Sequence, residues 1–302
     1  MNELHLHIDG SLRLSTLKEW CPNVPDDFGF KIGMNLQDCL ACFATTVEAL
    51  NSPKRLARVV REICQDQRAL GIDKTELRFA PHIHRASASE MIAAASENLE
   101  EGCTLVLCGL FGNPPDVLSE LIELSRKYPN VVGIDLAGAP SNVHKFKLKD
   151  YQDVFRMAKS YGFKTTAHLG EGRPASEIID AMHLLNLNRI GHGCSLLEDN
   201  RAKELIIEKR IVVEACPTSN IHVGVYQSIK EHPIKEWIRE GVLVTVCSDN
   251  TLMSRTNTMR ELQLLDLTEQ ERRWIEYSSQ VGLFPLRTKD SEPTPKGKKP
   301  LH

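Results

Sequence analysis

Eight short segments with the composition of buried β-strands recur along the chain, and helix-like stretches separate most of them. Each of these segments is short, and most are rich in Val, Ile, Leu or Thr, which is typical of parallel strands covered on both faces. The predicted strands are Glu3–Ile8, Lys74–Ala80, Thr104–Leu110, Val131–Gly138, Lys164–Leu169, Arg189–His192, Ile211–Ala215 and Leu243–Cys247.

The segments between the strands carry helical signals. Pro53–Leu70 places Leu56, Val59 and Ile63 at helical spacing, and Asp150–Tyr161 opens on an acidic residue and closes before a glycine. Further predicted helices are Ser87–Asn98, Pro115–Lys127, Ala175–Leu185 and Glu198–Lys209. Strand alternating with helix eight times favours an α/β fold, a (β/α)8 TIM barrel. A doubly wound open sheet is the alternative, weakened because no glycine-rich phosphate-binding motif follows any strand.

The length of 302 residues suits one such barrel and allows a core that needs no metal for folding. We expect a single domain over residues 1–285. The long insertion Cys21–Ser52 is expected to form helices on the barrel rim, or an apolar lid over the site. Residues 286–302 combine Pro, Lys, Ser and Gly with almost no apolar side chains, which predicts a disordered tail.

Charge and composition exclude several classes of partner. The net charge is −3 and no basic stripe runs along the chain, so no nucleic-acid groove is expected. No apolar run approaches the roughly 18 residues of a membrane helix, and the N-terminus lacks the pattern of a signal peptide. The nine cysteines, an odd number often placed in apolar runs, indicate free thiols in a reducing compartment. We therefore expect a cytoplasmic protein.

The first predicted strand carries two histidines two positions apart. Because side chains alternate along a strand, His5, His7 and Asp9 share the face that points into the barrel. Zinc accepts histidine nitrogens and carboxylate oxygens, and a catalytic zinc site leaves one position open for water. An isolated pair of this kind is more often without function, so the prediction depends on further ligands.

Further candidate ligands stand at the ends of other strands. His168 lies near the end of the fifth strand, and Asp249 follows the eighth. The carboxyl ends of barrel strands converge on one mouth, so these residues are expected to meet His5 and His7 there. Glu171 follows the fifth strand and His192 ends the sixth, at the same mouth, and each lies between glycines that let a ligand approach closely. Taken singly, each has an equally ordinary structural explanation, as a carboxylate near a helix start or as a buried histidine.

The sequence resembles the adenosine deaminase family of metal-dependent amidohydrolases over about residues 2–280. The matching segments, in the order of the family, are ELHLHIDGSLR (3–13), ELRFAPHIH (76–84), VVGIDLAG (131–138), AHLGEG (167–172), RIGHG (189–193), VEACPTSN (213–220) and VTVCSDNTLMS (244–254). The resemblance implies a barrel with one Zn²⁺ ion per chain at its mouth. It also implies hydrolytic deamination of adenosine, and of deoxyadenosine, with release of ammonia.

The resemblance also implies a role for each matching position. The metal ligands would be His5, His7, His168 and Asp249. Glu171 would be the acid that faces the purine ring, and His192 would be the base beside the attacking water. Gly138 would contact the purine, and Asp9 would contact the 5′-hydroxyl of the sugar. Asp249 is expected to hydrogen-bond the same water.

The chemistry of deamination agrees with those roles. Zinc lowers the pKa of a bound water toward about 7. Attack at C6 of the purine requires a proton at N1, which a carboxylic acid kept neutral in a dry pocket can donate. Glu171 is therefore expected to have a raised pKa, and His192 to orient the water and take its proton.

Asn250 departs from the pattern of the family, in which many members carry a second aspartic acid. That acid is expected to donate a hydrogen bond to purine N7, and an asparagine NH2 donates one without protonation. The alternative is that Asn250 only shapes a turn.

Asp9 bears on which purine is the substrate. A carboxylate accepts a hydrogen bond from a 5′-hydroxyl and repels a 5′-phosphate, which favours a nucleoside over AMP or N6-methyl-AMP. Adenine, N6-methyl-AMP and a 5′-modified adenosine remain alternatives. Further alternatives are a different amidohydrolase reaction and a non-catalytic nucleoside-binding relative.

Overall fold

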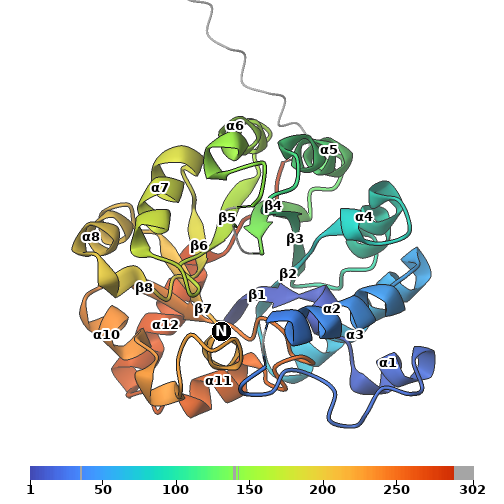
Figure 1. The fold of residues 1–302 in the computed structure, drawn as a ribbon, viewed down its shortest axis with the longest axis horizontal. Helices are drawn as coiled ribbons and strands as arrows, with labels where there is room; N and C mark the ends of the chain where they lie inside the picture. The colour runs from blue at the N-terminus through green and yellow to red at the C-terminus, as the bar shows by residue number, and fades with distance from the viewer. Residues whose placement is uncertain (35, 139–140, 142, 289–302) are drawn as a thin grey trace, which may run out of the picture.

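A computed structural model describes residues 1–34, 36–138, 141 and 143–288. In this part of the chain eight parallel strands follow one another around a barrel in sequence order (Figure 1). The strands are β1 (Asn2–His7), β2 (Lys74–Phe79), β3 (Cys103–Leu110), β4 (Val131–Ala137), β5 (Lys164–Leu169), β6 (Arg189–His192), β7 (Val212–Ala215) and β8 (Leu243–Val246). Each begins and ends within one residue of its predicted bounds.

Backbone contacts between the first strand and the end of the last complete the ring. Leu6 and Asp249 form a parallel bridge. The N–H of His7 donates to the carbonyl of Asp249 at 2.7 Å, and the N–H of Asp249 donates to the carbonyl of His5 at 2.9 Å. The predicted TIM barrel is therefore confirmed, and the alternative of an open sheet does not hold.

Helices surround the barrel (Figure 1). They are α1 (Leu14–Trp20), α2 (Leu36–Ala49), α3 (Pro53–Ala69), α4 (Ala88–Ser96), α5 (Pro115–Ser125), α6 (Gln152–Ser160), α7 (Ala175–Leu185), α8 (Asn200–Glu208), α9 (Pro217–His222), α10 (Ile234–Arg239), α11 (Thr258–Leu264) and α12 (Glu269–Gly282). The six predicted helices correspond to α3 through α8. The short helices α9, α10 and α11 span too few residues to show a periodic pattern. By contrast, α12 begins with a capping box between Thr268 and Glu271, and the spacing of these two residues can be recognised in the sequence.

The helix α3 illustrates why these segments are helical and where they pack. The side chain of Ser52 accepts a hydrogen bond from the N–H of Arg55, and Pro53 occupies the first turn, where its missing N–H costs nothing. Its apolar side chains, such as Leu56 and Val59, are fully buried against the barrel. Burying each of them stabilises the fold by about 1.5–3 kcal/mol.

The interior of the barrel holds a layer of paired charges rather than apolar side chains alone. Arg78 lies 2.9 Å from both Asp135 and Glu214, and Arg189 lies 2.6 Å from both Glu76 and Glu214. All five side chains are at most 1% exposed. Burial by itself raises the pKa of Glu214, but the two arginines outweigh it and lower that pKa to about 2. Such pairing is what makes buried charges tolerable in a core.

The segment between β1 and α3 packs beside the loop that follows β8. Phe30, Cys39 and Met253 form a buried apolar cluster, and the N–H of Phe30 donates to the carbonyl of Met253 at 2.6 Å. The predicted insertion Cys21–Ser52 therefore does contain a helix, α2, at the carboxyl-terminal side of the barrel. Its role as a lid stays a prediction.

The predicted tail at 286–302 falls mostly outside the described residues. Within them, Arg287 is held in place: its Nε donates to the carbonyl of Val131 at 2.6 Å, and its guanidinium stacks 3.6 Å from the ring of Phe163. The first residues of the predicted tail, 286–288, are thus described, and Arg287 among them packs against the barrel. Among the described residues, every helix is too short or too polar to cross a membrane. All nine cysteines are free, as predicted.

Candidate active site

The four predicted metal ligands come together at the mouth of the barrel. Nε2 of His7 lies 3.3 Å from Nε2 of His5 and 3.1 Å from Nε2 of His168. Oδ1 of Asp249 lies 3.7 Å from Nε2 of His5 and 3.6 Å from Nε2 of His7. Ligand atoms bound tetrahedrally to one zinc at about 2.0–2.1 Å lie roughly 3.3 Å from one another. The donor set and its spacing therefore fit a single zinc ion.

The barrel backbone brings these ligands into place. His5 and His7 share one face of β1, and the bridge between β1 and the end of β8 sets Asp249 beside them. A Cβ on Gly191 would lie 3.0 Å from Cε1 of His5, so the ring of His5 packs directly on the backbone of β6. Asp249 and His192 have φ angles of +61° and +63°, a left-handed conformation that is costly for residues other than glycine. Such strain is commonly kept where function requires it.

Two buried carboxylates orient the histidines from behind. Nδ1 of His5 lies 2.6 Å from Glu214, and Nδ1 of His168 lies 3.2 Å from Asp135. Because each carboxylate takes the Nδ1–H, Nε2 of each ring is left with its lone pair toward the cluster, as metal binding needs. Burial and the charge of Arg78 lower the pKa of His5 well below its ordinary value, which keeps that ring neutral.

We expect Asp135→Asn to weaken metal binding by about 10–100-fold, because the neutral amide orients His168 less strongly. Competition with a chelator of known affinity measures the dissociation constant. The control is Asp66→Asn, which alters an exposed ion pair with Arg13 outside the barrel. An unchanged dissociation constant in the Asp135 variant would contradict the orienting role.

Glu171 and His192 lie together on one side of the ligand cluster. Nδ1 of His192 lies 3.5 Å from Oε1 of Glu171. Burial raises the pKa of Glu171, although 26% of its side chain is exposed at the mouth. Burial lowers the pKa of His192 to about 4. Near neutral pH the site thus offers a neutral imidazole beside a carboxyl group that holds a proton more readily than usual.

The three predicted substrate contacts occupy loops around the cluster. Asp9 lies in the 3-10 turn after β1 with Oδ1 3.2 Å from Nε2 of the buried His84. Asn250 is buried and packs across Gly10, where an added Cβ would lie 1.8 Å from Oδ1 of Asn250. Gly138 directly follows β4 with φ +73°, and, its chain neighbours apart, no atom of the described residues lies within 4 Å of the place that a Cβ would take. The structure therefore gathers Asp9 and Asn250, whereas the contact roles of all three stay predictions.

Sequence reasoning left several residues of the site without a role. Ser219 donates to Oδ2 of Asp249 at 2.6 Å, and the amide of its neighbour Asn220 contacts both Glu171 and His192. His84, Asp135 and Glu214 were also left out. All five stand inside the segments that resemble the deaminase family, so their place in those motifs was the available signal.

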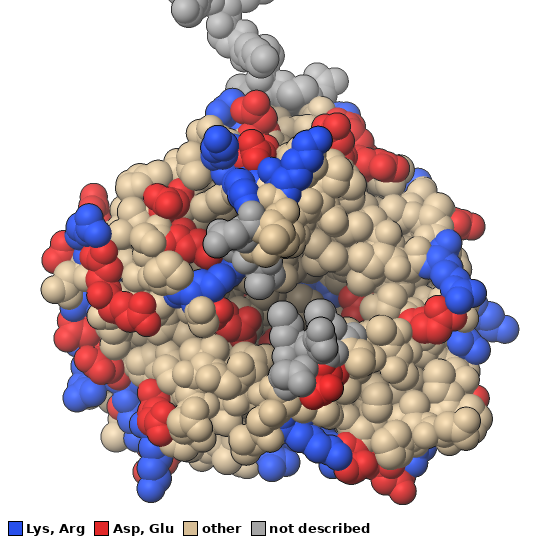
Figure 2. All heavy atoms as spheres, in the orientation of Figure 1, with Lys and Arg blue, Asp and Glu red and all other residues tan. Residues whose placement is uncertain are grey.

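The face of the molecule that carries the mouth is hollowed at its centre (Figure 2). Lys, Arg, Asp and Glu are intermixed around this face, with no stripe of one sign.

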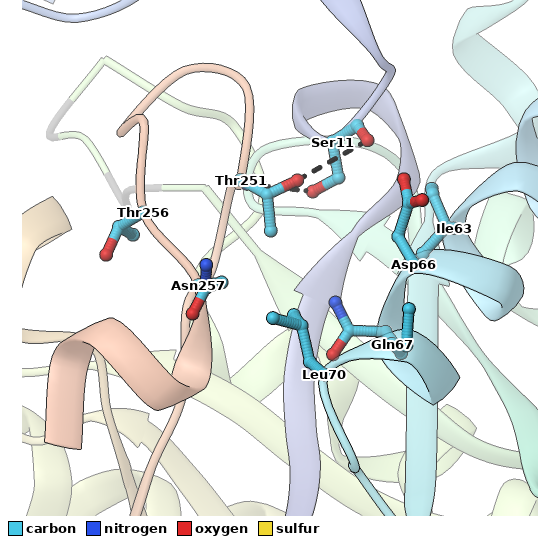
Figure 3. A pocket seen from close by; sticks show the side chains of 9 residues that line it. Ser11, Ile63, Asp66, Gln67, Leu70, Thr251, Thr256 and Asn257 are labelled. Atoms are coloured by element: carbon cyan, nitrogen blue, oxygen red, sulfur yellow. Dashed lines mark hydrogen bonds between the residues drawn. The ribbon is translucent and has the colours of Figure 1, made fainter.

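A separate cavity of about 370 Å³ lies between α3 and the loops that follow β1 and β8 (Figure 3). Its described lining includes Ser11, Asp66 and Thr251, and none of the predicted site residues. The N–H of Thr251 donates to Oγ of Ser11 at 3.1 Å. This contact ties the loop beyond His7 and Asp9 to the loop beyond Asp249.

Comparisons with known proteins agree with this geometry. The family model described as adenosine deaminase matches residues 1–271. The adenosine deaminase of Clostridium acetobutylicum is 32% identical over 283 residues, which cover 86% of this chain and 84% of that protein.

Solved structures share the fold. The adenine deaminase from Arthrobacter aurescens superposes with a TM-score of 0.84 at 20% identity, covering 94% of this chain and 93% of that one. A zinc-bound amidohydrolase from Burkhoderia ambifaria superposes with a TM-score of 0.81 at 19% identity, covering 94% of this chain and 85% of that one.

Proposed function

Because this chain belongs to the adenosine deaminase family, we propose that it hydrolyses adenosine and deoxyadenosine at C6 of the purine, releasing ammonia and, from adenosine, inosine. One observation carries the proposal: His5, His7, His168 and Asp249 converge at the mouth that also holds Glu171 and His192, with four distances of 3.1–3.7 Å between their donor atoms. A non-catalytic relative would have no need to keep the ligands and the acid together.

One zinc ion per chain is the proposed cofactor, held by His5, His7, His168 and Asp249. The zinc-bound relative of the same fold and the spacing of the donor atoms support this choice. A zinc ion in such a site makes hydroxide available near neutral pH.

The protein side chains supply the rest of the chemistry. Glu171 donates the proton that N1 of the purine needs, because its carboxyl has a raised pKa and faces the mouth. His192, which lies beside Glu171 at the same mouth, orients the attacking water. Asp249 hydrogen-bonds the same water, and its second oxygen is already held by Ser219. Gly138 and Asn250 complete the proposal as contacts to the purine ring.

Asp9 is the residue proposed to select a nucleoside. Its buried carboxylate beside His84 accepts a 5′-hydroxyl and disfavours a 5′-phosphate. A related 6-aminopurine is the second candidate, since the Arthrobacter aurescens protein of the same fold is an adenine deaminase. Adenine lacks the ribose that would reach Asp9.

We expect Asp9→Ala to lower kcat/KM for adenosine by about 10–100-fold, because a hydrogen bond to a charged group contributes about 1.5–3 kcal/mol. Turnover of adenine, which makes no such contact, should change far less. Ammonia release from both substrates measures the difference. Equal losses of kcat/KM for adenosine and adenine would contradict the proposed contact between Asp9 and the ribose 5′-hydroxyl.

The test of the whole proposal is ammonia release from a panel of adenosine, deoxyadenosine, AMP, N6-methyl-AMP and adenine. The highest kcat/KM is expected for the two nucleosides. A preference for a nucleotide or for adenine would show that the proposed substrate is wrong, while the proposed reaction, deamination, would still hold. No release from any of them by zinc-loaded protein would overturn the reaction itself.

A further inference from the structure

Asn220 contacts both groups that the proposed reaction uses for proton handling. It lies in α9, directly after β7, and is fully buried. Its Nδ2 lies 2.9 Å from Oε1 of Glu171 and 3.0 Å from Nδ1 of His192. An amide nitrogen carries two N–H groups and cannot accept, so it can serve both acceptors at once.

The orientation of this amide is fixed from its other end. Oδ1 of Asn220 lies 3.3 Å from Nε2 of His232, which donates to it. Nδ1 of His232 has no hydrogen-bond partner within the described residues, so the ring proton of His232 belongs on Nε2. The main-chain carbonyl of Asn220 also accepts the N–H of Val225 at 2.9 Å. Side chain and backbone of Asn220 are thus both held, with the NH2 group turned toward Glu171 and His192.

Glu171 and His192 lie close enough to pair with each other if nothing intervened. Their nearest atoms, Oε1 and Nδ1, are 3.5 Å apart. A direct bond would put the ring proton of His192 on Nδ1 and engage Glu171 as an acceptor. With Asn220 donating to both atoms, Nδ1 of His192 accepts, so the ring proton lies on Nε2. Oε1 of Glu171 likewise accepts, which leaves Oε2 as the oxygen free to carry a proton toward a substrate.

We propose that Asn220 is a positioning residue that keeps Glu171 and His192 from pairing and sets which atom of each faces the reaction. This inference rests on the proposed function, because it assigns how that site is held ready for a purine. His192 then presents an N–H at Nε2, so it holds the attacking water by donating a hydrogen bond to the water oxygen. This differs from the role of base that the family resemblance implied for it.

The experiment compares Asn220→Ala and Asn220→Leu with the wild-type protein. Leucine keeps a similar volume and removes both donors, so it separates lost hydrogen bonds from an emptied space. We expect kcat for adenosine to fall by about 10²-fold in both variants, because small misplacements of reacting groups cost about that much. KM and bound zinc should stay within about threefold of wild type, since Asn220 touches neither the metal ligands nor the ribose contact.

A binding measurement separates positioning from general loss of structure. The probe is a ribonucleoside analogue with a tetrahedral, hydroxyl-bearing carbon at the C6 position, compared with inosine. Affinity for the analogue should fall with kcat/KM while affinity for inosine changes little, because only the former resembles the transition state. The control is Thr218→Ala on the same helix, whose contacts go to Glu261 and not to the site.

Several outcomes would overturn the proposal. One is a kcat within about threefold of wild type in both variants. Another is a parallel loss of bound zinc, of inosine binding and of kcat, which would show that Asn220 has a structural role. Failure of both variants to fold would also show a structural role. An inactive wild-type protein is a different result, because it would refute the proposed function before any variant is compared.

Discussion

Glu171→Gln lowers kcat for adenosine by about 10²–10⁴-fold, the range typical of a lost general acid. Glutamine keeps the shape of the side chain and can hydrogen-bond to N1 of the purine, but it has no proton to transfer there. The metal ligands are untouched, so bound zinc should remain stoichiometric. Ammonia release and metal analysis of the same preparation measure both quantities.

The control for this variant is Glu177→Gln. Glu177 also follows β5 and is mostly buried, but its carboxylate pairs with Arg173 at 2.7 Å rather than facing the mouth. Its replacement should leave kcat within about threefold, since it holds no reacting group. If the Glu171 variant turned over near the wild-type rate with zinc bound, the assignment of N1 protonation to Glu171 would be wrong.

His7→Ala removes bound metal and lowers activity by about 10³-fold or more. Metal assistance contributes several kcal/mol to such reactions, and each 1.4 kcal/mol corresponds to about a factor of ten. Among the three histidines proposed as ligands, His7 is the best choice for substitution because its side chain is 15% exposed, whereas that of His5 is fully buried. Its loss therefore disturbs the barrel core least.

Chelation of the wild-type protein should reproduce this effect, and added zinc should reverse it there but not in the variant. The matched control is His82→Ala: that ring bonds Asn113 at 2.8 Å, away from the ligand cluster. Full metal content in the His7 variant would refute the predicted ligand set. Full activity in metal-free wild-type protein would refute the need for a metal.

The arrangement of strands was readable from the sequence because it depends on local composition. A strand such as Lys164–Leu169 is a short segment between two glycine-containing turns, and its bounds agree with the prediction. The alternation of side chains in β1 likewise predicted that His5 and His7 share one face. The convergence of strand ends in a barrel then predicted that His168 and Asp249 would join them, which is where the structure places them.

The helices after β7 were not predicted, for two different reasons. α9 and α10 each span six residues, less than two turns, so they carry no measurable period and depend on packing for stability. α12 is long enough, and its capping box at Thr268 and Glu271 was present in the sequence but not used.

The sequence by itself thus determined the order of strands and helices and named the candidate ligands, because periodicity and residue chemistry are properties of neighbouring positions. Only the tertiary structure decided which buried groups face one another: Arg78 between Asp135 and Glu214, and Asn220 between Glu171 and His192. These partners lie between 28 and 136 positions apart in the chain. Their contacts arise from closure of the barrel and from the direction of single side chains, and no local pattern of residues encodes either.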